Sequence, residues 1–369
     1  GDNYSLIDTN GAGGFESLSF QHPTTLLTVN SGDGDDSIEI QTLDSLAAMA
    51  VAVNAGTGND SVNVQGTRAA NALTVNGGDN DDTFTMDSNG IAAGGDADSV
   101  RSSVTFNGEG GANTLTLEDS GDSSGDSLTL TSTTAGGGDS FFAPQGSVTY
   151  SGRSALTING GSGGNSFTVQ STASGAPVAL NLGAGDDSLL VDSNGGTAGG
   201  SLENIVSALT VDGGAGTNTL TLEDSDDGSG DSVTLTATAI GAGGDSLFGV
   251  GGSLTYSSLS TLTLNGGSGG NTFTVQATAS GAAATLNTGS GDDSVTVDSN
   301  GIAFGGTVDG VVSLLMVNGQ GGTNSLTLED SSNLTADNIT ATDTTVDGGG
   351  SFFAPQGSLA YSGLASLTL

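Results

Sequence analysis

The residues best suited to chemistry in this chain are carboxylates held in glycine-rich turns. Ten segments follow the pattern small residue or Gly-x-x-Gly-x-Asp/Asn-Ser/Thr-apolar, as in Ser31 to Ile38. Cations are the partners that suit so acidic a chain, and carboxylates are ligands that hard cations accept. These carboxylates are therefore candidate cation ligands. The central candidates are Asp36, Asp60, Asp82, Asp187 and Asp293, and the neighbouring candidate ligands are Asp33, Asp35, Asp81, Asp186 and Asp292.

A purely structural role of the same turn positions is the alternative. The other five turns carry Asn instead of Asp, at Asn113, Asn165, Asn218, Asn271 and Asn324. Asp and Asn both tolerate turn geometry and hydrogen-bond to nearby backbone, and stacked Asn residues can form ladders without a metal. We expect ladders at the Asn turns. At Asp36, Asp60 and Asp82 a cation is favoured, because stacked carboxylates repel one another.

The elements that must position these turns are short strands. Apolar and polar residues alternate on either side of each turn, as in Phe273-Thr-Val275. This alternation, rich in β-branched residues, predicts strands with one buried face. Each unit therefore has the order strand, glycine turn, strand.

The spacing of the turns predicts the architecture. Asp36, Asp60, Asp82 and Asn113 hold the same position in four successive turns. Their intervals correspond to coils of about 22 to 31 residues, which are typical of an all-β parallel β-helix, or β-solenoid, whose stacked coils share one core. The longer interval from Asn113 to Asn165 is interpreted as two coils, and the interval from Asn218 to Asn271 repeats it. A string of small β-sandwiches is the less favoured alternative.

A longer repeat is superimposed on the short one. Asn113, Asn218 and Asn324 open similar blocks at nearly equal intervals, each with Leu-Glu-Asp-Ser and a later Tyr-Ser. We expect one continuous solenoid over 1–369, with long repeats over 113–217, 218–323 and 324–369 (truncated) after a shorter-coil stretch over 1–112. The pairs Phe141-Phe142 and Phe352-Phe353 are expected to pack on the coil beneath.

The turn motifs resemble a known family. The segment Ala55 to Asn63 is similar to the Gly/Asp-rich nonapeptide of RTX proteins, and the whole chain resembles the β-strand-repeat regions of giant bacterial extracellular or surface adhesins. The resemblance implies that calcium lies between turns of a β-roll, with the turn carboxylates as its ligands, and that the chain is secreted and is extracellular or at the cell surface. The sequence departs from the RTX pattern because its motifs lie one coil apart and half of them carry Asn.

Composition narrows the function classes. The chain has 41 acidic residues against three arginines, no lysine, and a formal net charge of -38. It cannot supply the basic face that nucleic acids require, and no apolar run approaches the ~20 residues that span a membrane. Expected partners are divalent cations, other copies of itself or further repeats of the same chain, and surface glycans.

We expect a non-catalytic structural segment of a fibre or adhesin that is stabilised by calcium and can form filaments. The only histidine, His22, lies in an expected loop without a supporting catalytic motif. A polysaccharide-binding or polysaccharide-cleaving β-helix is the alternative function. An ice-binding solenoid with a flat Thr face is the minor alternative.

Overall fold

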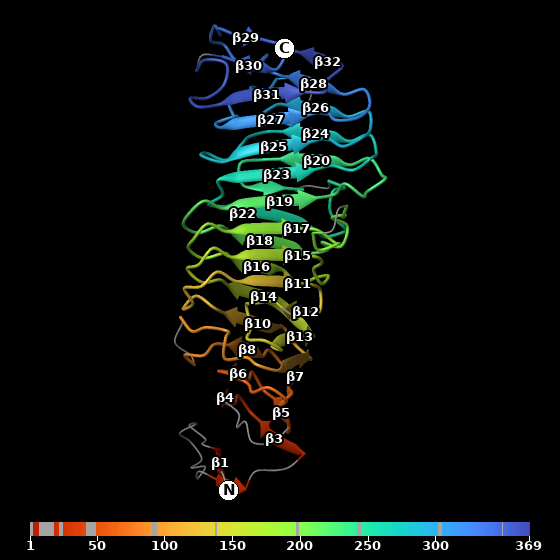
Figure 1. Cartoon of the computed structure of the whole chain (residues 1–369). Coiled ribbons are helices and arrows are strands. Elements are labelled where there is room, and N and C mark those ends of the chain that lie inside the picture. Colours follow the sequence, from red (N-terminus) through yellow and green to blue (C-terminus); the bar gives the residue numbers. More distant parts are fainter. Residues whose placement is uncertain are drawn as a thin grey trace. The chain divides into compact units, whose positions relative to one another are not determined.

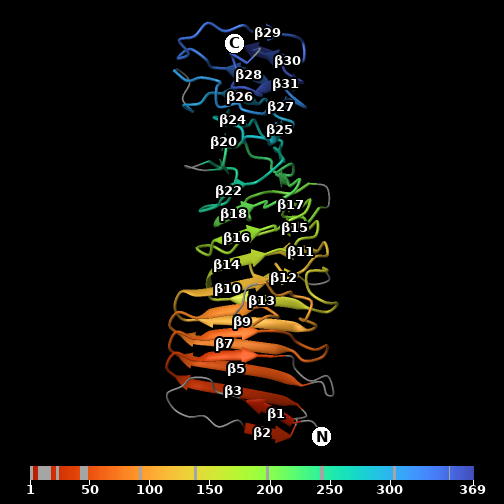
Figure 2. The same cartoon turned by 90° about the vertical axis from the view of Figure 1, so that its left-hand side faces the viewer.

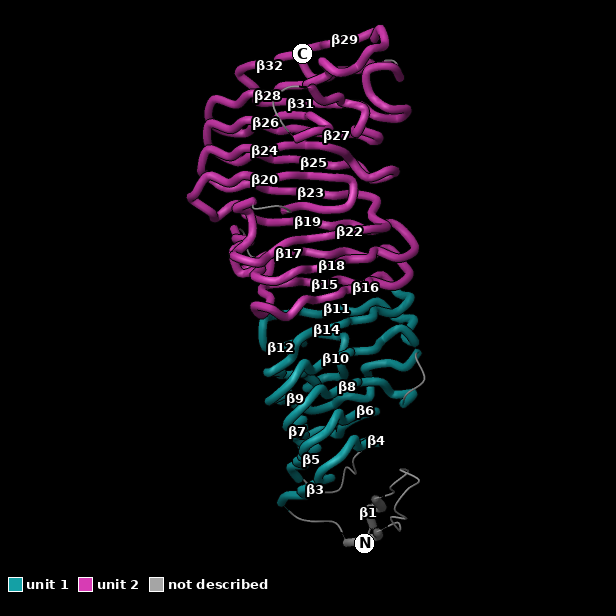
Figure 3. The backbone as a smooth tube through the Cα atoms, turned by 180° about the vertical axis from the view of Figure 1, so that it is seen from behind, with its two compact units in different colours: residues 1–163 teal, residues 164–369 magenta. Residues whose placement is uncertain are grey.

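A computed structural model describes residues 3–6, 18–21, 25–41, 49–90, 94–136, 139–196, 199–241, 245–301, 305–348 and 350–369. The described residues form strands and no helix, so the all-β prediction is confirmed. Nowhere in these ranges is there a helix of the length and hydrophobicity needed to cross a membrane. His22 lies outside them. The chain divides into two compact units, Gly1–Gly163 and Gly164–Leu369 (Figure 3).

Unit 1 contains two sheets and a short antiparallel pair, β1 (Asn3–Leu6) with β2 (Leu18–Gln21). The first sheet holds, in spatial order, β3 (Leu26–Asp33), β5 (Ala50–Thr57), β7 (Leu73–Asp79), β9 (Ser103–Glu109), β13 (Ser147–Ser151), β12 (Thr134–Gly136) and β11 (Ser127–Leu130). The second holds β4 (Ser37–Ile40), β6 (Ser61–Val64), β8 (Thr83–Met86), β10 (Asn113–Glu118) and β14 (Arg153–Asn159). Figure 2 shows β3, β5, β7 and β9 side by side.

Unit 2 repeats this plan. Its first sheet holds, in spatial order, β15 (Ser166–Val169), β17 (Ser188–Val191), β19 (Thr219–Glu223), β23 (Thr261–Asn265), β25 (Ala283–Asn287), β27 (Leu314–Asn318), β31 (Ser358–Ser362), β30 (Thr345–Asp347) and β29 (Thr340–Ala341). Its second holds β16 (Val178–Asn181), β18 (Ala208–Asp212), β22 (Ser253–Ser257), β21 (Ala239–Ile240), β20 (Ser232–Leu235), β24 (Thr272–Val275), β26 (Ser294–Val297), β28 (Ser325–Leu328) and β32 (Ser366–Thr368). Figure 1 shows β23, β25, β27 and β31 stacked in order.

The alternating sequence pattern places one face of each strand in the core. In β24, Phe273 and Val275 are buried while the hydroxyl side chains of Thr272 and Thr274 point outward. Parallel register then stacks like on like, so Phe273 pairs with Val295 of the next coil. The two sheets of each unit face each other across this apolar core, as the contact of Phe84 with Phe106 at 5.2 Å between ring centroids shows in unit 1.

Coil lengths agree with the sequence spacing. In adjacent parallel strands Leu26 pairs with Ala50, Val51 with Leu73, and Leu73 with Val104. These offsets equal the sequence intervals between the successive turn residues Asp36, Asp60, Asp82 and Asn113. The parallel β-solenoid with coils of about 22 to 31 residues is therefore confirmed. The division at Gly163 falls inside the expected repeat 113–217, and continuity of one solenoid over 1–369 stays a prediction.

Some coils are longer because a three-stranded antiparallel insert extends one sheet. In unit 1, β11, β12 and β13 form this insert, and the Tyr150 hydroxyl donates to the Thr131 carbonyl at 2.6 Å. The equivalent inserts of unit 2 are β20 to β22 and β29 to β31. The aromatic pairs beside two of the inserts, Phe141-Phe142 and Phe352-Phe353, are buried as expected.

The two inserts of unit 2 lie in opposite sheets. The strands between them, β23 to β28, alternate between the sheets, so each new copy of the insert begins in the other sheet. Asn218 stands just before β19 in one sheet, whereas Asn271 stands just before β24 in the other. The interpretation of the interval from Asn218 to Asn271 as two coils is therefore wrong. Two complete coils would return the turn to the same sheet, whereas Asn271 precedes a strand of the other sheet.

Glycine is required where turns of successive coils touch. Gly56 has φ +114°, and a Cβ there would lie 1.9 Å from the carbonyl oxygen of Gly32. Gly78 has φ +108°, and its Cβ would lie 1.9 Å from the carbonyl oxygen of Gly56. A side chain at either position would combine an unfavourable φ with a backbone clash. These glycines let the turns stack closely enough for their Asp and Asn side chains to reach the next coil.

Candidate cation sites

The turn Asp and Asn residues form a hydrogen-bonded ladder from coil to coil. In unit 1 the backbone N–H of Asp36 donates to Asp60 Oδ1 at 2.8 Å, that of Asp60 to Asp82 Oδ1 at 3.0 Å, and that of Asp82 to Asn113 Oδ1 at 2.7 Å. Unit 2 has the same bonds along Asn165, Asp187 and Asn218, and along Asp231, Asn271, Asp293 and Asn324. Asp and Asn are therefore equivalent in this bond, which needs only an acceptor at Oδ1.

The second side-chain atom distinguishes Asn from Asp. Asn113 Nδ2 donates to the carbonyl oxygens of Gly110 and Gly152 at 2.8 and 3.0 Å. The corresponding Oδ2 atom of an Asp cannot donate. It is buried and has no hydrogen-bond partner at Asp36, Asp60, Asp82, Asp187 and Asp293.

Glycines five residues earlier show that these atoms occupy equivalent places. A Cβ on Gly108 would lie 2.5 Å from Asn113 Nδ2, and a Cβ on Gly77 would lie 2.1 Å from Asp82 Oδ2. Asp82 therefore directs an acceptor to the place from which Asn113 directs a donor. A proton on Oδ2 or a cation next to it would satisfy that oxygen.

The electrostatics agree with this description. Burial raises the pKa of Asp60, and the charges of Asp36 and Asp35 raise it further. Burial likewise raises the pKa of Asp82 and of Asp187. A buried carboxyl that is not offset by a cation holds its proton more tightly. At the predicted turn sites, the unpaired Oδ2 atom could therefore be satisfied either by a cation or by a proton.

The neighbouring candidate acids are exposed and have a different role. Asp35 Oδ1 accepts a hydrogen bond from the backbone N–H of Asn59 at 2.8 Å, so this ladder runs in the opposite direction to the buried one. Asp81, Asp186 and Asp292 accept the equivalent bonds from Ala112, Thr217 and Thr323. Asp33 Oδ1 accepts from the Thr57 hydroxyl at 2.9 Å. These exposed oxygens therefore stabilise the turns by hydrogen bonds on the solvent side.

The amide ladder expected from stacked Asn lies elsewhere. Asn54 Nδ2 donates to Asn30 Oδ1 at 2.6 Å, Asn76 to Asn54 at 2.7 Å, and Asn107 to Asn76 at 2.8 Å. These residues precede the glycine turns. The Asn residues within the turns bond to backbone groups instead, because the close approach of the turn backbones offers N–H and C=O groups first.

A second group of carboxylates begins with the Asp of the Leu-Glu-Asp-Ser segment. One carboxylate oxygen each of Asp119, Asp122 and Asp126 lie within 4.8 Å of one another. Asp119 is 1% exposed; its Oδ1 accepts the backbone N–H of Ala97 at 2.9 Å, whereas its Oδ2 is buried without a partner. Such a group could hold a metal ion.

The next long repeat has a related group, in which two of the three carboxylates occupy equivalent positions. Glu203, Asp224 and Asp227 form a group within the same distance, and Asp231 stands where the first repeat has Asp126. Asp224 is 0% exposed, its Oδ1 accepts the backbone N–H of Leu202 at 2.9 Å, and its Oδ2 has no partner.

The first cluster cannot be fully ionised at low cost. Burial raises the pKa of Asp119 to about 8, and the charges of Asp126, Asp122 and Asp98 add to the effect. Burial and the contact with Asp122 raise the pKa of Asp126 to about 6. Hydrogen bonds from the Ser124 hydroxyl and amide lower the pKa of Asp122. Protons or a hard cation must therefore offset the remaining charge.

Sequence reasoning treated Leu-Glu-Asp-Ser only as a repeat marker. The signal that it missed is the acidic spacing Asp-x-x-Asp-x-x-x-Asp that begins at Asp119 and again at Asp224. In a loop, this spacing does not by itself predict convergence. The loop conformation brings the side chains together.

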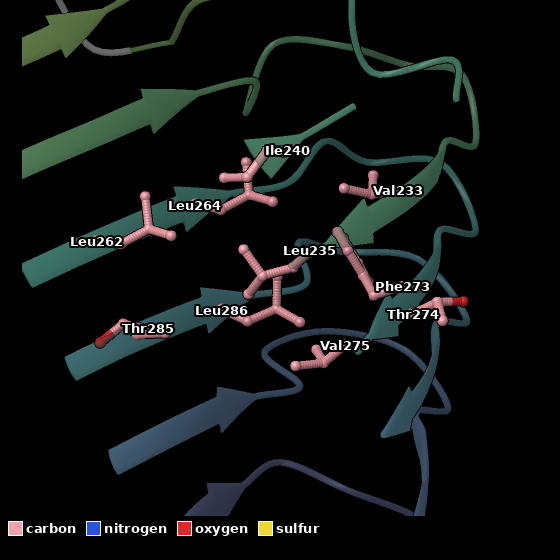
Figure 4. Close-up of a pocket in the computed structure, with 11 residues that line it drawn as sticks. Val233, Leu235, Ile240, Leu262, Leu264, Phe273, Thr274, Val275, Thr285 and Leu286 are labelled. Atoms are coloured by element: carbon pink, nitrogen blue, oxygen red, sulfur yellow. The ribbon is translucent and has the colours of Figure 1, made fainter. Parts of the chain in front are cut away.

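A small pocket lies among the core side chains of unit 2 (Figure 4). Strands of both sheets line it, with Val233 and Phe273 from one sheet and Leu264 and Leu286 from the other. Its lining residues are apolar apart from two threonines, and none is charged. It offers no group for acid–base catalysis.

The chain matches no protein-family model and no curated protein. The resemblance to RTX repeats therefore stays a prediction from the motifs.

Proposed function

We propose that this chain is a non-catalytic structural segment of a secreted or cell-surface fibre or adhesin, stabilised by divalent cations, with calcium foremost. Its partners would be these cations, further copies or repeats of the same chain, and surface glycans. The extracellular location rests on the resemblance to RTX and adhesin repeats.

The single observation that carries the structural role is the pairing of coil on coil within each unit. In unit 2, β23 pairs with β25, β25 with β27, and β27 with β31, all parallel and in register. Hydrogen bonds between such strands run along the stacking direction. Side chains of both sheets fill the space between them. A stack of this kind suits a spacer better than a catalyst.

Cation dependence is supported by charge and by the orphaned oxygens. A net charge of -38 favours expansion of the chain through self-repulsion. The buried Oδ2 atoms of the turn Asp residues have no donor facing them. A bound divalent cation would offset both effects, because it neutralises charge and supplies the missing contact.

A thermal melt followed by circular dichroism tests the cation dependence. The chain is melted in calcium and in excess chelator at equal ionic strength. We expect a large fall in melting temperature on chelation, and an unchanged melt would remove calcium from the proposal. Incubation with acidic polysaccharides tests the non-catalytic part, because any depolymerisation would favour the polysaccharide-cleaving alternative.

Ice binding remains the second candidate because of one specific feature. The outer face of the second sheet of unit 2 carries a register column of threonines, Thr234, Thr274, Thr296, Thr327 and Thr368. A parallel column, two residues earlier in each strand, contains Ser232, Thr272, Ser294, Ser325 and Ser366. A thermal hysteresis measurement separates the two functions, since a spacer gives none.

A further inference from the structure

The loop that follows each Leu-Glu-Asp-Ser segment differs between the long repeats in one informative position. Asp122 and Asp227 occupy that position in the first two repeats, and Asn333 occupies it in the third. All three side chains adopt the same local turn. Oδ1 of Asp227 accepts the backbone N–H of Ser229 at 3.1 Å, and Oδ1 of Asn333 accepts that of Thr335 at 2.9 Å.

In the third repeat an amide takes the place of one carboxylate of the cluster. Asn333 Nδ2 donates to Asp337 Oδ2 at 3.2 Å. In the first repeat the equivalent pair is Asp122 with Asp126, two carboxylates that can bond only by sharing a proton. The third repeat replaces a carboxylate–carboxylate contact by an amide–carboxylate hydrogen bond. Among the described residues of the third repeat no group of three carboxylates converges.

The buried member of each cluster points to a ligand. Asp119 and Asp224 are almost fully buried, and each directs one oxygen into the group while its Oδ2 has no hydrogen-bond partner. An ionised, unpaired carboxylate oxygen that is buried beside two further carboxylates is costly unless a proton or a cation offsets its charge, and a cation would contact all three side chains at once.

We infer that the Asp119/Asp122/Asp126 cluster and the Glu203/Asp224/Asp227 cluster, which Asp231 adjoins, each bind one divalent cation of the calcium class, and that the third repeat has exchanged this ion for the Asn333 hydrogen bond. All the side-chain donors are carboxylate oxygens, which hard cations prefer. Glu203, which precedes Asp224 by one coil, is one of the three converging carboxylates of the second cluster, and Asp98, at the equivalent position of the first, adds negative charge near Asp119.

The position of the clusters gives the ion a structural task. Asp126 immediately precedes β11, and Asp231 immediately precedes β20, so each cluster lies where an inserted three-stranded segment begins. Asp119 is bonded to Ala97 of the preceding coil. An ion bound here would tie the start of the insert to the coil before it. In unit 2 the backbone of Asp231 also bonds to Asn271 of the turn ladder.

This inference shares with the proposed function only the need for a divalent cation, and it concerns different residues from the turn ladder. Calcium binding to the chelator-stripped full chain is measured by isothermal titration calorimetry near neutral pH. The variants are Asp122→Asn, Asp227→Asn and Asn333→Asp. Asn is already present at this loop position in the third repeat, so the first two variants are expected to fold, and circular dichroism checks this. Asp343→Asn removes one exposed charge elsewhere and serves as the matched control.

We expect Asp122→Asn and Asp227→Asn each to remove one ion or to weaken it at least tenfold, and the double variant to remove both. Asn333→Asp should add one ion, and Asp343→Asn should leave the stoichiometry unchanged. Unchanged binding in both Asp→Asn variants, or a loss equal to that of the Asp343→Asn control, would overturn the inference.

A triple variant Asp36→Asn/Asp60→Asn/Asp82→Asn separates the two kinds of site. Loss of ions only in this variant would leave the calcium-stabilised function intact and reject the clusters. Loss only in the cluster variants would support the clusters and reject calcium at the turn ladder. A wild-type chain that binds no calcium would reject both.

Discussion

Replacement of Asp82 by Asn tests the turn ladder most directly. Asp82 is 1% exposed and its Oδ2 has no partner, whereas the equivalent Nδ2 of Asn113 donates to two carbonyl oxygens. Asp82→Asn keeps the Oδ1 acceptor that the backbone N–H of Asp60 uses. The substitution replaces the unpaired, buried Oδ2 acceptor by an Nδ2 donor. It also removes a carboxyl group whose pKa is raised by burial.

The size of the effect follows from the unmet hydrogen bond. A buried polar atom without a partner costs about 1–3 kcal/mol. In excess chelator near neutral pH we therefore expect Asp82→Asn to raise the free energy of unfolding by about 1–3 kcal/mol. In calcium the gain should shrink or change sign, because the variant loses a ligand. Urea unfolding followed by circular dichroism in both buffers measures the difference.

The reverse change provides the matched control. Asn113→Asp places a fourth carboxyl in the ladder of Asp36, Asp60 and Asp82 and removes two hydrogen bonds. In chelator it should lower the free energy of unfolding by about 1–3 kcal/mol. If Asp82→Asn instead destabilised the chelated chain by more than about 1 kcal/mol, the interpretation of Oδ2 as an unmet acceptor would be refuted.

Three further predictions concern pH, turn stacking and the inserts. Burial raises the pKa of Asp119 from 3.8 to about 8. The protonated carboxyl therefore contributes stability that is fully present below pH ~4 and is lost as the pH rises through about 8. The chelated chain should melt at a higher temperature near pH 5 than near pH 8.5. Gly78→Ala should destabilise unit 1 by more than about 2 kcal/mol in urea unfolding, because φ is +108° and the Cβ would meet the Gly56 carbonyl oxygen. Tyr256→Phe removes the hydroxyl that donates to the Thr236 carbonyl at 2.6 Å and should cost about 1 kcal/mol by the same assay, and no loss would mean that this bond does not hold the insert.

Local residue patterns were sufficient to predict the strands, the glycine turns and the coil length. Alternation such as that of Phe273 and Val275 is a local property, since side chains of a strand point to opposite faces in turn. The spacing from Asp36 to Asp60 to Asp82 gives the coil length, because equivalent turns must stack. These features depend on residues near one another in the chain, which is why pattern reasoning could predict them.

The sequence also predicted that the Asp residues of the turns form a group, but it did not reveal the direction in which their side chains point. Asp35 and Asp36 are neighbours in sequence, yet Asp35 is exposed and the Oδ2 of Asp36 is buried. Their oxygens accept or face backbone groups of different coils. Only the register between coils decides which carboxylate meets water and which meets protein.

The tertiary structure alone decided the sheet that each repeat occupies and the convergence of Asp119, Asp122 and Asp126. An inserted segment that stays in one sheet shifts every later turn to the opposite sheet, so equal spacing in sequence does not mean equal position in space. The cluster depends on a loop that folds back on itself and on a hydrogen bond to Ala97 of the coil before. Contacts between coils depend on strand register and backbone direction, which no local pattern of residues encodes.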